Sequence, residues 1–307
     1  MLLEDKVKDI GSSMVMCGAN CLSVDNSPNG KTPPRCLYFR GDFQDDLEKI
    51  QKEIKSDIQQ NIENLVKKRD AKKIDKLKSL KNKDYSSELI KALEKVKLTQ
   101  DNSKKLRGDI IKDIKNWFLS EKSHEFNYNG VIIIGQNPGF NKEKESEFYQ
   151  SDAYQGANGN ERFTLQNDFF EKHLLTKEPF YININLFLSK IIGSFNKPII
   201  YTEAVHCQSK SDAKKIDIET YATCMNKHLF QILNEQEIKN WLLIIVHKDS
   251  SDYIQIHAPT LKKIVIPHPS GQHTHYKLKK IIQNDLKLAE IQNFLKEKKK
   301  TYIKINP

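Results

Sequence analysis

The chain has 307 residues, and its 50 Lys and Arg against 40 Asp and Glu give a formal net charge of +10 and a pI near 9.1. This length holds one large domain, or a catalytic domain with an accessory piece. A basic balance is typical of proteins that bind a polyanion such as nucleic acid, although a lysine-rich, solvated surface gives the same composition. No apolar run approaches the ~20 residues that cross a bilayer, and the amino terminus is too charged for a signal peptide. We therefore expect a soluble, cytoplasmic protein without a membrane partner.

Two segments precede the first expected strand. Residues 1–42 form an irregular segment that carries cysteines and packs on the core, with turn residues at 26–34. From Phe43, apolar residues recur every three or four positions among charged residues, and no proline or glycine interrupts them before Gly108. We expect an antiparallel helical hairpin, with or without a third short helix, in an insertion that spans 43–128. Its role stays open between a DNA clamp, an arm that binds a protein partner and a lid.

From residue 129 the pattern becomes α/β, and 129–307 is the expected catalytic domain. The candidate strands are 131–135, 180–187, 198–206, 241–247 and 262–267. The helical patterns are 161–175, 216–233, 252–258 and 277–299. Because strands alternate with helices, we expect βαβ units and a mostly parallel sheet.

Two of these strands run directly into polar motifs. The run 131–134 leads into Gly-Gln-Asn-Pro-Gly at 135–139, and 264–266 leads into Pro-His-Pro-Ser at 267–270. Open α/β sheets place their ligands just beyond the carboxyl ends of such strands. We therefore expect Asn137 and His268 to face each other across one pocket.

The chain's five cysteines are Cys17, Cys21, Cys36, Cys207 and Cys224. Cysteines gathered from distant parts of a chain are what a thiolate-held metal ion or iron–sulfur cluster requires. Small, buried, inert cysteines are the alternative.

The motifs at 135–139, 202–207 (Thr-Glu-Ala-Val-His-Cys) and 267–270 resemble, in this order, those of the uracil-DNA glycosylase superfamily. The resemblance covers 129–295 together with the amino-terminal cysteine pair. It implies a three-layer α/β/α fold around a central, mostly parallel sheet of four or five strands.

Iron–sulfur members of this superfamily hold a 4Fe-4S cluster with four cysteines. The resemblance assigns the ligands to Cys17, Cys21, Cys207 and Cys224, with Cys36 as a substitute because Cys17 and Cys21 stand one residue further apart than usual. The cluster's role would be structural. Zinc remains the alternative, because the sequence does not determine the metal.

Hydrolysis of an N-glycosidic bond needs a group that places water at C1′ and a donor that stabilises the departing base. The resemblance assigns the first role to Asn137 and the second to His268. Cluster-containing members carry Glu at the position of Gln136, so this chain mixes the features of two branches. Tyr149, with Phe148 beside it, stands where the family stacks the flipped base, and packing under the loop is the alternative.

The segment after the last motif stands where family members contact DNA. We expect Ser270, Gln272 and His273 to lie in the minor groove and Lys277 to bind a phosphate.

Glu203 is the most informative departure from the family, because uracil-specific members carry Asn there. A carboxylate only accepts hydrogen bonds, so it suits an amino group such as cytosine N4 better than uracil O4. Uracil read by backbone groups, with Glu203 turned away, is the alternative. The resemblance thus implies a monofunctional DNA glycosylase for modified cytosine or uracil, in DNA repair or in defence against phages with modified DNA. The rival is a non-catalytic DNA-binding or damage-sensing module on the same fold.

Overall fold

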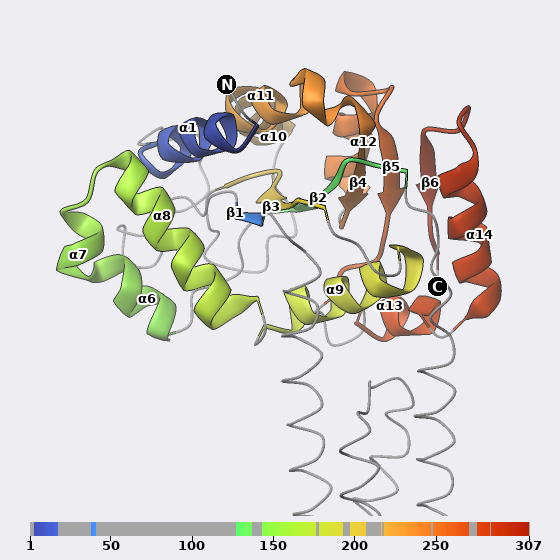
Figure 1. Cartoon of the computed structure of the whole chain (residues 1–307), viewed down its shortest axis with the longest axis horizontal. Helices are drawn as coiled ribbons and strands as arrows, with labels where there is room; N and C mark the ends of the chain where they lie inside the picture. Colours follow the sequence, from blue (N-terminus) through green and yellow to red (C-terminus); the bar gives the residue numbers. More distant parts are fainter. Residues whose placement is uncertain are drawn as a thin grey trace, which may run out of the picture. The chain divides into compact units, whose positions relative to one another are not determined.

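A computed structural model describes residues 3–17, 38–40, 127–136, 143–175, 178–192, 197–206, 216, 218–246, 248–269, 275–282 and 284–306. Figure 1 labels the described helices and strands along the chain. The chain divides into two compact units. The first contains Met1–Phe43, Phe126–Ile184 and Asn196–Pro307, and the second contains Gln44–Glu125 and Asn185–Phe195. The helical insertion expected over 43–128 lies outside the described residues, except for 127–128.

Within the described residues one sheet has the strand order β1-β3-β2-β4-β5-β6. The strands are β1 (Tyr38–Arg40), β2 (Gly130–Gly135), β3 (Ile199–Glu203), β4 (Trp241–Ile245), β5 (Lys262–Val265) and β6 (Tyr302–Lys304). Strands β2 to β6 pair in parallel, and β1 pairs with β3 as an antiparallel edge strand. The four inner strands are buried along their whole length, which explains their near-continuous apolar sequences. The expected α/β fold with a mostly parallel sheet is confirmed.

The strand order creates a switch point beside β2. The chain passes from β2 to β3 on one side, and then continues with β4 on the other side of β2. Open α/β sheets bind ligands at the carboxyl ends of the strands where the order reverses in this way. Gly135 ends β2 at this point.

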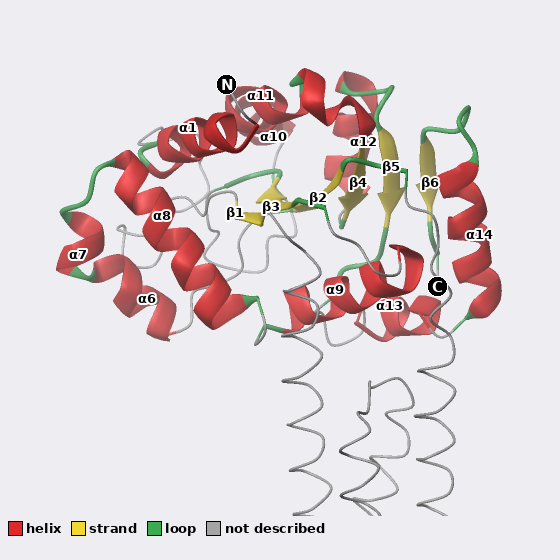
Figure 2. Cartoon of the chain, viewed as in Figure 1, coloured by secondary structure: helices red, strands yellow, loops and turns green. Residues whose placement is uncertain are grey.

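One face of the sheet is covered by helices from both halves of the chain. Helix α1 (Leu3–Val15) lies here with α8 (Gly159–Phe169), α10 (Ile218–Cys224), α11 (Phe230–Leu233) and α12 (Lys248–His257) (Figure 2). Their apolar side chains form one core with alternate strand residues such as Ile132, Ile200 and Leu243. Two π-helical turns, Phe170–Leu174 and Met225–Leu229, continue α8 and α10.

The opposite face is covered by different elements. Tyr201 of β3 contacts the ring of Phe170 at 5.1 Å and that of Tyr181 at 5.6 Å, measured between ring centroids. Tyr181 belongs to the first turn of α9 (Pro179–Ile192). Helices α13 (His275–Ile282) and α14 (Asp285–Lys296) also lie on this side, where the Lys262 ammonium sits 3.9 Å from the Phe294 ring centroid. The sheet therefore lies between two helical layers.

The strand expected at 180–187 is wrong, because this segment lies in helix α9. Its sequence, Phe-Tyr-Ile-Asn-Ile-Asn-Leu-Phe, imitates the alternation of a strand. The fully or largely buried positions Tyr181, Ile184 and Leu188 instead recur at steps of three and four. Proline at 179, a favoured first residue of a helix, starts it.

The expectation of an irregular segment over 1–42 is wrong at Leu3–Val15, which form α1. Val7 and Met14 of this helix are buried at helical spacing. Gly11 lies against the Phe163 ring so closely that a β-carbon at 11 would overlap it. The short helices α6 (Glu143–Gln150) and α7 (Asp152–Gln155) were also not expected.

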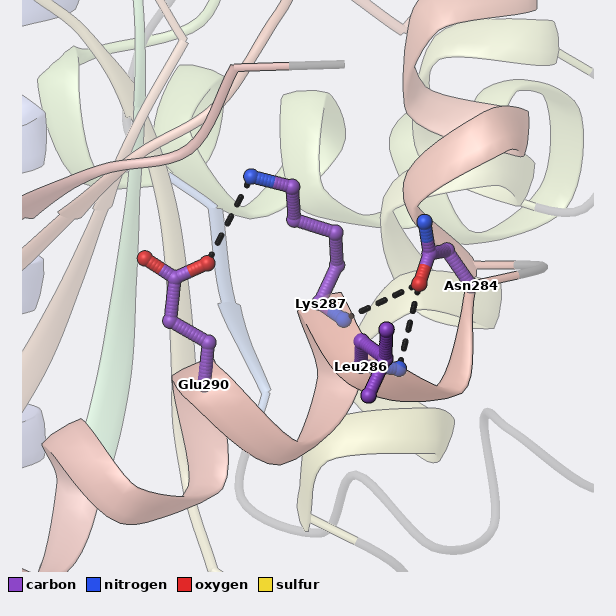
Figure 3. Close-up of polar contacts among 4 residues, drawn as sticks. All are labelled: Asn284, Leu286, Lys287 and Glu290. Carbon is purple, nitrogen blue, oxygen red and sulfur yellow. Dashed lines mark hydrogen bonds and ion pairs between the residues drawn. The ribbon is translucent and has the colours of Figure 1, made fainter.

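The single helix expected over 277–299 is two helices, α13 and α14. Asn284 separates them, because its side-chain oxygen accepts hydrogen bonds from the backbone N–H groups of Leu286 at 3.1 Å and Lys287 at 3.2 Å (Figure 3). Such an N-cap satisfies the free donors of a new helix start. Lys287 and Glu290 then form an ion pair at 3.5 Å on the first turns of α14.

Candidate functional site

Strand β3 supplies residues to both faces of the sheet at its carboxyl end. Ile200 lies in the core beneath α1 and α10, whereas Tyr201 contacts Tyr181 of α9. Since side chains alternate along a strand, Thr202 lies on the same face of the sheet as Ile200, and Glu203 lies on the same face as Tyr201. Cys224 belongs to the same core as Ile200, so it and Glu203 lie on opposite faces of the sheet.

Gly135 and Glu203 are directly paired neighbours on β2 and β3. A β-carbon at position 135 would lie 2.7 Å from the carboxyl carbon of Glu203, so the absence of a side chain at 135 makes room for the carboxylate. The Glu203 side chain is largely buried, with 9% exposed. Beyond the strands, Ala204 N–H donates to Gly135 O and Val205 N–H donates to Gln136 O, both at 2.9 Å. The first and second motifs are thus joined in space.

His268 lies at the same edge, in the loop that follows β5. Ile266 N–H donates to Ile245 O at 2.9 Å, which continues the β4–β5 pairing up to this loop. Because β4 separates β5 from β2, the two motif-bearing loops start two strand spacings apart, roughly 10 Å.

Helix α9 holds the His268 loop in place. The Asn183 amide, which is largely buried, donates from Nδ2 to Pro269 O at 2.8 Å. One turn earlier, the ring of Phe180 lies 5.4 Å from that of His268, tilted by 57°. Neither α9 residue was expected at the site, because the alternating sequence of this segment predicted a strand.

Tyr149 lies in the interior and is 2% exposed. The rings of Phe148 and Tyr154 contact it edge-on at 5.0 and 5.3 Å, and Phe148 stacks on Phe169 at 4.3 Å. These contacts are those of a packed aromatic cluster. Gln136 is half-buried just after β2.

Several expected site residues lie outside the described part of the chain. They are Asn137, Ser270, Gln272 and His273, together with the side chain of Lys277. Their roles stay predictions.

On the other face of the sheet, two cysteines each contact an imidazole. Cys224 accepts from the His206 backbone N–H at 3.3 Å and lies 3.4 Å from His206 Nδ1. Cys17, just after α1, lies 3.3 Å from His228 Nε2 and accepts from Lys227 Nζ at 3.2 Å. The two imidazole rings are 5.4 Å apart. The structure thus brings the amino-terminal cysteine and Cys224 to one cluster with two histidines.

Both imidazoles are neutral at neutral pH. Burial, and then the neighbouring His228, lower the pKa of His206 to about 3. Burial, and then the Lys227 charge, lower the pKa of His228 to about 4. His206 Nε2 lies 3.1 Å from Thr202 Oγ1, which fixes the ring's orientation. His228 stands four residues after Cys224, a helical spacing that could have marked it in the sequence.

The described residues contain no group of three or more His, Cys, Asp and Glu side chains arranged to hold a metal ion. Cys21, Cys36 and Cys207 lie outside them. N–H donors directed at sulfur are nonetheless the surroundings that stabilise a metal-bound thiolate. Cys17 and Cys224 each have one such donor, and their roles as metal ligands stay predictions.

No family model matches this chain, and no curated protein matches it. No helix among the described residues has the length and apolar character to cross a membrane.

Proposed function

We propose that this protein is a monofunctional DNA glycosylase, which hydrolyses the N-glycosidic bond of a flipped base and leaves an abasic site. The observation that carries the proposal is the placement of the Gly135–Glu203 pair and the His268 loop at one edge of the sheet, beside the switch point. The order of the three motifs along the chain adds support. The target would be a base other than the four standard ones, either a modified cytosine or uracil.

In the proposed reaction, water attacks C1′ of the sugar, and the bond from C1′ to the base nitrogen breaks with its electron pair passing to the base. Asn137 would orient the water, and the proton that the water loses is passed through solvent to the departing base. His268 would donate a hydrogen bond to the base carbonyl oxygen, where negative charge collects. No motif position holds a lysine suited to Schiff-base chemistry, so we do not propose strand cleavage.

The identity of the base would depend on Glu203. Its carboxylate is largely buried and lies against Gly135. A carboxylate accepts a hydrogen bond from an exocyclic amino group and repels a carbonyl oxygen. We therefore propose a modified cytosine as the preferred substrate, with uracil as the weaker one.

A 4Fe-4S cluster held by Cys17, Cys21, Cys207 and Cys224, with Cys36 as the substitute ligand, belongs to the proposal as a structural element. The N–H donors around Cys17 and Cys224 support it. Iron, sulfide and zinc content of the purified protein, with absorbance near ~400 nm, distinguishes the cluster from zinc.

Excision assays test the proposal directly. Duplex and single-stranded oligonucleotides containing uracil, hypoxanthine or 5-hydroxymethylcytosine are incubated with the protein, and abasic sites are detected by alkaline cleavage. We expect Asn137→Ala and His268→Ala to lower kcat by roughly 100- to 1,000-fold, because each removes a transition-state contact. His257→Ala, an exposed histidine at the end of α12, is the matched control.

Three outcomes would contradict parts of the proposal. Binding of the oligonucleotides without abasic sites would favour the non-catalytic damage-sensing module. Excision that survives both substitutions would refute the site. Excision of uracil alone, unchanged in Glu203→Gln, would refute the cytosine preference.

The proposed partner is DNA, and the proposed setting is cytoplasmic DNA repair or defence against phages with modified DNA. The net charge of +10 supports a polyanionic partner. The segment 43–128 is a proposed arm for DNA or for a protein partner, which a variant lacking it would test by comparing DNA affinity with excision rate.

A further inference from the structure

A DNA glycosylase stacks the flipped base on an aromatic ring. The packing of Tyr149 indicates that its ring is not available for this role. This ring is 2% exposed and has the rings of Phe148 and Tyr154 against it. A base could stack on it only if this cluster opened. Tyr149 is therefore accounted for by packing between α6 and α7.

Phe180 has the opposite environment. It is half-buried on the first turn of α9, with its ring 5.4 Å from that of His268. It also contacts Tyr181, with the ring centroids 5.1 Å apart, and Tyr181 packs on Tyr201 of the sheet. The Phe180 ring thus packs on a buried tyrosine and stands beside the proposed base-binding histidine.

The loop that carries His268 is fastened to the same helix. The hydrogen bond from Asn183 Nδ2 to Pro269 O connects α9 with this loop one residue beyond His268. The separation between Phe180 and His268 is consequently held by an inter-element hydrogen bond as well as by the ring contact. A base whose carbonyl oxygen accepts from His268 would lie within reach of the Phe180 ring.

We propose that Phe180 is the base-binding aromatic residue of this protein, and that the flipped base stacks on its ring while His268 donates to the base carbonyl oxygen. The inference rests on the proposed glycosylase function. It assigns to α9 a role in base recognition that the sequence analysis gave to Tyr149.

The test compares four variants of the full-length protein by single-turnover excision of uracil and 5-hydroxymethylcytosine. Phe180→Leu removes the aromatic face, and Phe180→Tyr restores it. Tyr149→Leu tests the rival assignment, and Phe163→Leu, in the core on the other face of the sheet, controls for lost packing. Thermal denaturation of each variant shows whether it is folded.

We expect Phe180→Leu to lower kcat/KM by roughly 10- to 100-fold, as the loss of one base-stacking contact does, and Phe180→Tyr to keep it within a few-fold. A duplex that carries 2-aminopurine at the target position separates stacking from positioning of His268. If Phe180 stacks, Phe180→Leu weakens binding of this probe and alters its fluorescence, whereas His268→Ala leaves the fluorescence of the bound base unchanged.

The inference is overturned if folded Phe180→Leu excises like wild type, if Phe180→Tyr is as impaired as Phe180→Leu, or if only Tyr149→Leu loses the fluorescence change. If wild type excises neither base and does not change the probe's fluorescence, the proposed function itself fails and the inference falls with it.

Discussion

Glu203 lies against Gly135 at the carboxyl ends of two paired strands, and its carboxylate occupies the space that any side chain at position 135 would need. Gly135 of the first motif and Glu203 of the second stand 68 positions apart in the sequence, and they therefore form one structural unit. The first motif requires glycine here because of what the second motif carries.

Gly135→Ala should displace the Glu203 carboxylate and destabilise the protein by about 1–3 kcal/mol, the usual cost of overpacking a well-filled site. Urea denaturation measures it. In the Glu203→Ala background the same substitution should cost much less, because the clashing group is gone. Equal costs in the two backgrounds would show that the carboxylate does not oppose a β-carbon at 135. Gly156→Ala, an exposed helix cap with αR backbone, is the control for the change itself.

Asn183→Leu should remove the hydrogen bond that fastens the His268 loop to α9 and leave the Pro269 carbonyl without this donor. We expect a loss of about 1–3 kcal/mol in the free energy of unfolding. The excision rate should fall by more than the loss of folded protein explains, since the loop also positions His268. Asn167→Ala, which removes an amide that donates to Phe163 O within its own helix, is the control. Unchanged excision in Asn183→Leu would separate α9 from the site.

Lys263 should make stability rise with pH in a defined window. Its fully buried ammonium donates to Ala258 O and Leu261 O, both at 2.6 Å, and burial lowers its pKa to about 8 from an ordinary 10.5. Between these two values the unfolded chain binds more protons than the folded one, so the free energy of unfolding increases from pH 8 toward 10.5. Urea denaturation at several pH values measures this slope.

Lys263→Met keeps the apolar stem but has no titrating group, so this contribution to the slope should vanish in the variant. Lys280→Met, exposed on α13, should retain the wild-type slope. A Lys263→Met curve parallel to that of wild type would mean that the ammonium titrates at its ordinary pKa.

Lys227→Met should weaken the hold on the metal group that we propose at Cys17. The Lys227 ammonium donates a hydrogen bond to Cys17 Sγ at 3.2 Å, and a donor of this kind supports a sulfur atom that holds a metal ion. Loss of bound iron or zinc to a chelator should become roughly 10-fold faster, as when a group that supports a metal ligand is removed. Lys239→Met, exposed after α11, is the control. Equal rates would place Cys17 outside the metal site, and a preparation without metal would refute the cofactor proposal.

The local sequence pattern accounts for most of the sheet. The runs 131–134 and 241–246 are continuous and apolar, which is typical of interior parallel strands, and the structure has β2 and β4 there. It also placed the strand ends, because Gly135 and Pro267 interrupt such runs. These features are local, and local patterns are readable without the rest of the chain.

The tertiary structure decided what the local pattern left ambiguous. Residues 180–187 alternate like a strand, yet they form α9, because burial at helical spacing outweighs a short alternating pattern. Only the fold brings Phe180 to His268, Glu203 to Gly135 and Cys17 to His228. Such neighbours are set by strand order and helix packing over long separations, and no spacing in the sequence encodes them.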